Sequence, residues 1–220
     1  MAIQVQGNGG TTAEVDGTAF RALRVVPKPL DHGAFGHFRL ATTVPLVVTQ
    51  AANGTLFSFR WGDATRLCVI QKLRLAVLQT AAQTATQGLR YQAFFARSFT
   101  ASDSVGTAIT LTGNSMKKRT SHATSLVTDI RKSAVAAGLT VGTRTLDAEP
   151  FLEIGHVHTI TNINTLVSEK QLDTDAGDGV HPFVLAQNEG IIIRGPTTVF
   201  GAAGTADLLV EMAWAEVTAY

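Results

Sequence analysis

Two histidines separated by a single residue are the first candidates for chemistry in this chain. His156 and His158 lie in the segment LEIGHVHTI. On a β-strand, where side chains alternate between faces, both imidazoles project from one face about 7 Å apart. This spacing suits zinc or copper, but a metal site needs at least one further ligand, such as His122, Glu153 or His181. The alternative, and the more common situation, is a pair of hydrogen-bonded strand histidines without a metal.

An acidic, glycine-bearing segment, Asp173–Gly179, has some features of a calcium-binding loop. Asp173 and Asp175 match the first and third ligand positions of such a loop. Asp178 stands where an invariant glycine is required, and Val184 stands where a bidentate glutamate is required. The match therefore fails, and we expect a polar turn. A weak surface calcium site is the alternative.

Other sequence signals for catalysis are weak. Cys68 is a single cysteine within an apolar run, so we expect a small buried side chain and no disulfide within the chain. Gly7–Gly10 lacks the spacing of a phosphate-binding loop, and no GxSxG or HExxH motif occurs. We therefore expect no enzyme, no cofactor and no small-molecule substrate. A small β-sandwich hydrolase or cupin-like metalloenzyme using His156 and His158 is the minor alternative.

A basic segment, MKKR, supplies a candidate contact with another protein. Lys117, Lys118 and Arg119 follow one another in a polar stretch that we expect to be a loop. Such charges steer and align an acidic partner, and a simple solvated loop is the alternative. The formal net charge is only +1, and the basic residues lack interleaved aromatic residues. We therefore expect neither nucleic acid nor a membrane as a partner.

The elements that position these residues are expected to be β-strands. Short apolar or alternating runs, bounded by Gly, Pro, Asn, Asp and Thr, occur along most of the chain, without helical periodicity. They indicate roughly eight to eleven strands in an antiparallel sandwich or barrel. The fold we expect is a jelly-roll-like β-sandwich, an arrangement that packs two sheets of four strands. Residues 1–18 are predicted to form an extended N-terminal arm, and residues 19–220 a single domain. Charged residues make up only 16% of the chain, which is typical of surfaces that pack against other subunits.

Three segments carry specific expectations. The segment TLFSFRW, residues 55–61, should place Phe57, Phe59 and Trp61 on one face and polar side chains on the other. Strict alternation along residues 67–79 should place Ile70 and Lys72 on the same face.

The last segment, residues 187–217, should form a closing hairpin of two strands, IIIRG and TADLLVEMAWAEV. Residues 188–190 are its expected entry turn, with Gly190 at positive φ. In the final strand, one face should carry Leu208, Val210, Met212 and Trp214.

Several stretches together resemble a family of tailed-bacteriophage virion proteins. They are QGNGGTTAEVDGTAFRALRV, LFSFRWGDATRL, FFARSFTASDSVGTAITLTGNSMKKRTS, LVTDIR, GTRTLDA, HPFVLAQNEGIIIR and AAGTADLLVEMAWAEV. The resemblance covers most of the chain, about residues 5–217, and is lowest between Glu149 and Asp178. Its motifs are strands and turns, so it transfers no catalytic residue.

The resemblance implies a component of the virion. With its predicted arm and low-charge surface, the chain looks like the capsid decoration (cement) proteins that sit as trimers on the outer shell. The expected partners are then the major capsid protein and copies of the chain itself, in a homotrimer. The expected location is the head surface, after synthesis in the host cytoplasm. The expected contact residues are Gln4, Gln6, Asn8, Thr11, Thr12, Lys117, Lys118 and Arg119.

A second hypothesis keeps the virion but changes the role. The chain would be a tail, neck or fibre component, and residues 149–180 would bind a sugar or a surface receptor, using Trp61, His156 or His158.

Overall fold

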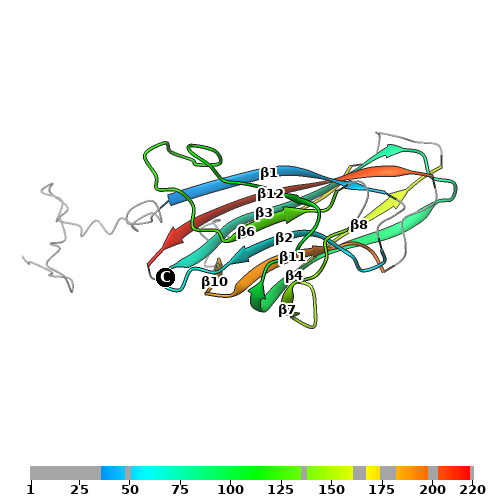
Figure 1. The fold of residues 1–220 in the computed structure, drawn as a ribbon. Coiled ribbons are helices and arrows are strands. Elements are labelled where there is room, and N and C mark those ends of the chain that lie inside the picture. Colours follow the sequence, from blue (N-terminus) through cyan, green and yellow to red (C-terminus); the bar gives the residue numbers. More distant parts are fainter. Residues whose placement is uncertain are drawn as a thin grey trace, which may run out of the picture. The chain divides into compact units, whose positions relative to one another are not determined.

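Twelve β-strands and no helix make up the described part of the chain (Figure 1). The computed structural model describes residues 36–47, 51–134, 138–160, 167–173, 182–197 and 203–218. The strands are β1 (Gly36–Leu46), β2 (Thr55–Trp61), β3 (Leu67–Ala81), β4 (Gln87–Ala101), β5 (Thr107–Ala108), β6 (Asp129–Lys132), β7 (Thr143–Leu146), β8 (Leu152–His158), β9 (Val167–Asp173), β10 (Phe183–Leu185), β11 (Glu189–Arg194) and β12 (Thr205–Val217). Within these ranges, no helix is long and apolar enough to cross a membrane.

Part of what the sequence predicts lies outside the described residues. The N-terminal arm is among these parts, with its contact candidates Gln4, Gln6, Asn8, Thr11 and Thr12. So are His181 and, apart from the backbone of Asp173, the acidic segment through Gly179. The described residues all belong to one compact unit of the chain, Gly33–Tyr220.

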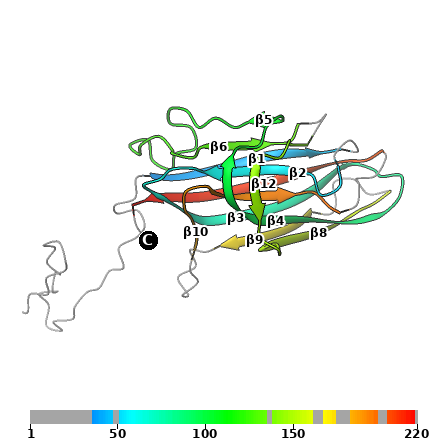
Figure 2. The ribbon, with the colours of Figure 1, turned by 60° about the horizontal axis from the view of Figure 1, so that its bottom comes forward.

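The strands form two antiparallel sheets that pack face to face (Figures 1 and 2). Sheet I has five strands in the order β1-β12-β3, with β9 and β10 both paired to the far edge of β3. Sheet II has seven strands in the order β5-β6-β2-β11-β4, with β7 and β8 both paired to the far edge of β4. The predicted all-β antiparallel sandwich is confirmed, although the sheets do not hold four strands each.

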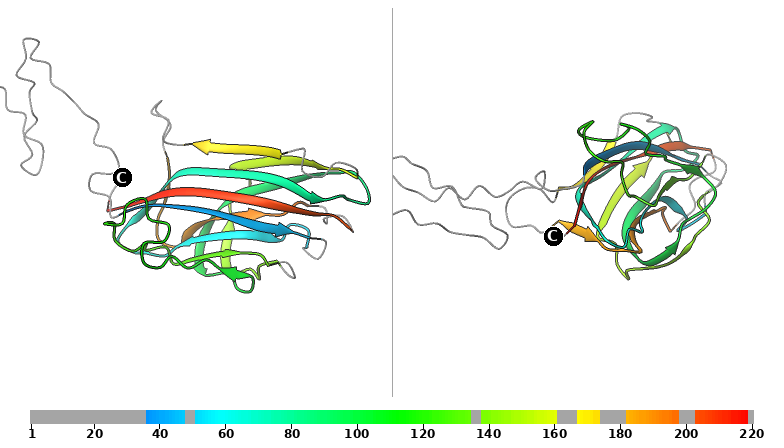
Figure 3. Two further views of the ribbon diagram at one scale, coloured as in Figure 1. Left: turned by 90° about the horizontal axis from the view of Figure 1, so that it is seen from above. Right: turned by 60° about the vertical axis from the view of Figure 1, so that its left-hand side comes forward.

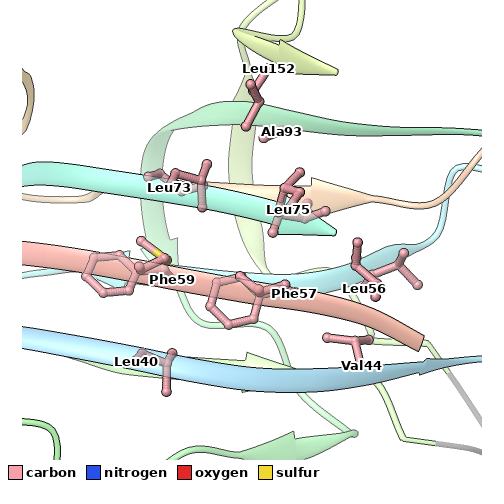
Figure 4. Packing of buried hydrophobic residues seen from close by; sticks show 14 of the residues in the cluster. Leu40, Val44, Leu56, Phe57, Phe59, Leu73, Leu75, Ala93 and Leu152 are labelled. Atoms are coloured by element: carbon pink, nitrogen blue, oxygen red, sulfur yellow. The ribbon is translucent and has the colours of Figure 1, made fainter. Parts of the chain in front are cut away.

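The core lies between the inner faces of the two sheets. On β12, Leu208, Val210, Met212 and Trp214 alternate inward and are at most 2% exposed, as predicted. Figure 4 shows residues of β1, β2 and β3 meeting in this layer, with Phe57 and Phe59 among the leucines of the facing sheet. Burying a large apolar side chain stabilises a fold by roughly 1.5–3 kcal/mol, so this layer is the main source of stability.

The prediction that the last two strands form a closing hairpin is wrong. β11 is an inner strand of sheet II and pairs with β2 and β4. β12 is an inner strand of sheet I and pairs with β1 and β3. The three isoleucines of β11 are all completely buried. A strand that is apolar on both faces is more stable between two neighbours than in an isolated hairpin, and this explains why the chain crosses between sheets.

The turn that leads into β11 also differs from expectation. Positive φ occurs at Asn188 (60°), not at Gly190. Asparagine tolerates this conformation better than most residues. Gly190 is required for another reason: a Cβ there would lie 2.2 Å from the carbonyl oxygen of Phe59.

A bulge in β3 breaks the alternation expected along that strand. Trp214 faces Ile70, and the preceding Ala213 faces Lys72, so Gln71 is an extra residue in the ladder. As a result, Ile70 joins the core between the sheets, whereas Lys72 lies on the outer face. The expectation that these two side chains share a face is wrong, because one inserted residue shifts the side-chain period.

The aromatic face of β2 points into the core, as expected, but its other face is not exposed. Ser58 is only 2% exposed. A second small apolar cluster covers this outer side of sheet II, where Phe99 and Ile192 pack with Leu146. Arg60 donates from Nε to the carbonyl oxygen of Phe99 over 2.7 Å. Residues 99–103, at and after the end of β4, and residues 142–146, in and before β7, therefore bury what looks like a solvent face in the sequence.

Candidate contact surface at the start of the first strand

The predicted basic loop is attached to the outer edge of β1. The Arg39 amide donates to the Met116 carbonyl over 2.8 Å, and the Lys118 amide donates to the His37 carbonyl over 2.8 Å. Phe38 and Lys117 form the bridge between these two bonds. The loop thus acts as a short additional strand. It satisfies backbone groups that an edge strand otherwise leaves open.

Side chains of the loop reach the β3 bulge. The extra residue, Gln71, presents its Oε1 to Lys118 Nζ at 3.3 Å. His37 Nδ1 lies 3.3 Å from the same oxygen. His122 closes the arrangement, because its Nδ1 accepts the His37 amide over 3.0 Å. The bulge therefore supplies a contact that holds the loop in place.

Glu216 anchors the following part of the loop from inside the sandwich. Its Oε1 accepts from Ser125 Oγ over 2.6 Å and from the Leu126 amide over 3.1 Å. The side chain is only 1% exposed, and its burial raises the pKa of the carboxyl group. Glu216 was missed from the sequence, although it is in phase with the inward residue Trp214. A charged residue at an inward position of a strand was the available signal.

The resulting corner carries cations that form no ion pair with the described residues. Arg39, Lys118 and Arg119 are exposed and Lys117 is half-buried. Within the described ranges, none of these four cations forms an ion pair. By contrast, Arg74 on the same sheet lies 2.6 Å from each of two glutamates. The predicted residues Lys117, Lys118 and Arg119 thus join Arg39, which the sequence did not single out.

The same corner is where both ends of the described sandwich meet. The first residue of β1, Gly36, is paired with Glu216, near the end of β12. Figure 3 shows the start of β1 (blue), the end of β12 (red) and the green loop together at one end of the sandwich. Gly36, the first described residue of β1, therefore lies beside the basic loop.

The histidine pair lies on the strand predicted for it, but points into the protein. His156 and His158 are 2% and 0% exposed, and their ring centroids are 4.5 Å apart. His156 Nδ1 lies 3.0 Å from Ser168 Oγ, and His158 Nε2 lies 3.0 Å from the Tyr91 hydroxyl. Burial lowers the pKa of both imidazoles; that of His158 falls to about 4, partly because of the neighbouring His156. Both rings are therefore neutral at pH 7.

The other predicted metal ligands are not brought to this pair. Glu153 points to the opposite face of β8 and accepts a hydrogen bond from Gln92 over 2.6 Å. His122 belongs to the basic loop, and His181 is outside the described residues. Across the described ranges, no cluster of three or more His, Cys, Asp and Glu side chains is placed to hold a metal ion.

Two further candidate residues are also buried. Trp61 is 0% exposed and donates from Nε1 to the carbonyl oxygen of Arg66 over 3.0 Å. Like the two histidines, it is not available to a surface ligand, so the receptor-binding hypothesis loses the three residues suggested for it. Cys68 is completely buried, as predicted, and burial raises the pKa of its thiol well above the usual range.

Comparisons with known proteins add no family to this description. No protein-family model matches the sequence, and no curated protein matches it. Among solved structures, the chain shows 15% sequence identity and a TM-score of 0.13 to a chain in the structure of infectious bursal disease virus Gx strain. The matched region covers 84% of this chain and 40% of that chain, so this chain spans less than half of the viral chain's length. At this TM-score, the similarity carries no argument about fold or function.

Proposed function

We propose that the protein is a non-enzymatic structural component of a bacteriophage virion, a capsid decoration protein that binds and reinforces the outer head shell. Its partners in this proposal are the major capsid protein and copies of itself in a homotrimer on the head surface. One observation carries the proposal. The loop with unneutralised cations is fastened to β1 at the point where the N-terminal segment joins the sandwich. The predicted contact loop thus lies beside Gly36, the first described residue of β1.

The geometry of the corner suits attachment to a larger assembly. Backbone bonds to β1 and the Glu216 anchor hold the loop in one conformation before any partner arrives. Such preorganisation lowers the entropy cost of binding. Unpaired cations accelerate encounter with an acidic surface and align the two partners. In a trimer, each weak contact is repeated, and linked contacts raise the overall affinity without new interactions.

Binding to virus particles that lack this protein tests the proposal. The variant K117Q/K118Q/R119Q removes the loop charges, and R90Q/K170Q removes exposed charges from β4 and β9 as a control. Each rim charge contributes roughly 0.5–1 kcal/mol, so we expect about 10- to 100-fold weaker binding for the loop variant and less than 3-fold for the control. Added salt should weaken wild-type binding more than binding of the loop variant.

Deleting residues 2–18 tests the other half of the contact. We expect the shortened chain to fold, with unchanged thermal stability of the sandwich, and to lose particle binding. Equal binding of wild-type, shortened and loop-variant chains would contradict the proposal. Electron microscopy of particles should show density at regular lattice positions on the head. Density only at the tail or neck would instead support the tail-component alternative.

A further inference from the structure

On one side of the sandwich, β8 of sheet II and β9 of sheet I are the neighbouring strands. β8 pairs only with β4 of sheet II, and β9 pairs only with β3 of sheet I. The two strands lie next to each other (Figures 2 and 3), but no backbone ladder joins them. We refer to this boundary as the β8–β9 seam. A contact between side chains, His156 Nδ1 to Ser168 Oγ at 3.0 Å, connects the two strands.

The interior beside the seam is unusually polar. His156 Nε2 has no hydrogen-bond partner among the described residues, nor do either of the two amide atoms of Gln83. Gln83 is only 4% exposed. The Oε1 atom of Gln87, which pairs with His158 across the ladder, is likewise buried without a described partner. Each unsatisfied buried polar group costs free energy that hydration recovers, so exposing this region to water is less unfavourable than exposing the apolar core.

Neutral groups surround the two imidazoles on the β4 side. Tyr91 lies against His158, and burial raises the pKa of its hydroxyl well above the ordinary value, so it remains uncharged at acidic pH. Arg90 is exposed on the other face of β4, where Glu153 of β8 lies 3.5 Å away. The inward positions of β3 near the seam carry Val77 and Gln79, which do not titrate.

The described side chains of β9, residues 168–172, direct no negative charge toward the pair. Ser168 touches His156, and two residues later Lys170 follows on the same side of the strand. Glu169 points to the other face, where Arg74 binds it over 2.6 Å. Among the described residues, no carboxylate therefore faces the pair. A proton added to either ring becomes a buried charge beside a second imidazole only 4.5 Å away.

We propose that the β8–β9 seam opens at acidic pH. The seam is closed while His156 and His158 are neutral, and β8 and β9 separate there when the two histidines take up protons. Separation lets water solvate the two imidazolium rings and the unpartnered amides. The other strands of sheets I and II stay paired through their own ladders. Leu152 and Ile154 of β8 belong to the apolar core, so we expect the separation to be confined to the part of β8 that carries the two histidines. This property is separate from particle binding and holds whether or not the virion proposal is correct.

The direction of the pH effect follows from the two states of His158. In the closed seam its pKa is about 4, whereas a solvated histidine has a pKa near 6.5. The open form therefore binds the proton first as the pH falls from about 6.5 to about 4. Over that range, the ratio of open to closed molecules should rise about 80-fold for this group alone.

Two spin labels across the seam test the proposal in the full chain. Val157 of β8 is 51% exposed, and Gln171 of β9 is exposed, so V157C/Q171C accepts labels while the buried Cys68 does not. We expect one narrow distance distribution at pH 7.5, a longer and broader one at pH 4.5, and recovery on return to pH 7.5. Adding H156Q/H158Q should keep the distribution narrow at both pH values.

Several outcomes would overturn the proposal. They are an unchanged distribution at pH 4.5, and the same opening in the labelled glutamine variant. Loss of the folded-state fluorescence of the buried Trp61 and Trp214 together with opening would also do so, because it indicates global unfolding. If the glutamine variant does not fold, NMR titration of the wild-type imidazoles decides. Titration of both rings near pH 6.5 with the seam closed contradicts the proposal, and titration only together with opening supports it.

Discussion

The buried ion pair between Asp103 and Arg144 gives a sharp test of how the outer face of sheet II is covered. Their side chains are 0% and 3% exposed. Asp103 Oδ1 accepts from Arg144 Nη1 and from the Gly142 amide, the latter over 2.8 Å. Arg144 Nη2 also donates to Thr55 Oγ1 over 2.9 Å. The pair thus joins residues 99–103 to residues 142–146 and, through Thr55, fastens them to the start of β2.

Removing one partner leaves the other charge buried without compensation. Such a loss typically costs about 3–5 kcal/mol, whereas replacing both partners by apolar residues of similar volume is often neutral or stabilising. We therefore expect D103N and R144M each to lose about 3–5 kcal/mol of the free energy of unfolding. The double variant D103L/R144M should lie within about 1 kcal/mol of the wild type.

Urea denaturation at pH 7, followed by tryptophan fluorescence, measures these differences. With a slope of roughly 3 kcal/mol per molar urea, each single variant should lower the midpoint by about 1–1.7 M. R90Q, which removes an exposed cation, is the control and should change the free energy by less than about 0.5 kcal/mol. Two results would refute the reasoning: single variants that cost less than about 1 kcal/mol, or a double variant whose cost equals the sum of the two.

Three further predictions follow from particular residues. Gly190→Ala should lower the free energy of unfolding by more than about 3 kcal/mol, since the added Cβ would lie 2.2 Å from the Phe59 carbonyl oxygen. A change in melting temperature of less than about 2 °C corresponds to about 1 kcal/mol or less and would contradict this prediction. Val105 is a β-branched residue at φ 62°, so Val105→Gly should raise the free energy of unfolding by about 1 kcal/mol in urea denaturation. The adjacent Gly106 is at φ 61°, so Gly106→Ala should lower it by at least about 2 kcal/mol. The contribution of His158 to the free energy of unfolding is complete above about pH 6.5 and falls by at most roughly 3 kcal/mol towards pH 4, because its pKa in the closed seam is lowered and opening of the seam limits the loss; thermal denaturation of His158→Gln should show a flatter pH profile than the wild type.

Periodicity along single strands was enough to predict the type of fold and several inward faces. Strict alternation identified the core side of β12 and placed both histidines on one face of β8. These features are local, because a strand has a side-chain period of two whatever it pairs with. The basic loop and the buried Cys68 were also predictable, since composition alone distinguishes a polar loop from an apolar strand.

Strand pairing and burial were decided by the tertiary structure. β11 and β12 follow each other in the sequence but enter different sheets, because the isoleucines of β11 are buried only when both its faces are covered. The bulge at Gln71 exists because Trp214 and Ala213 of another strand set the register. Ser58 looks like a solvent-facing residue until the segment from Phe99 onward covers it.

The same distinction between sequence and tertiary structure applies to the basic loop and to the β8–β9 seam. The sequence by itself determined which residues carry charge or an imidazole, and on which strand or loop they lie. Only the tertiary structure decided that Lys118 reaches Gln71 beside the start of β1, and that His156 faces Ser168 in a neutral interior. These partners are separated by 47 and 12 residues in the chain. Local propensities do not encode such distant neighbours, because they arise only when the two sheets close over a shared core.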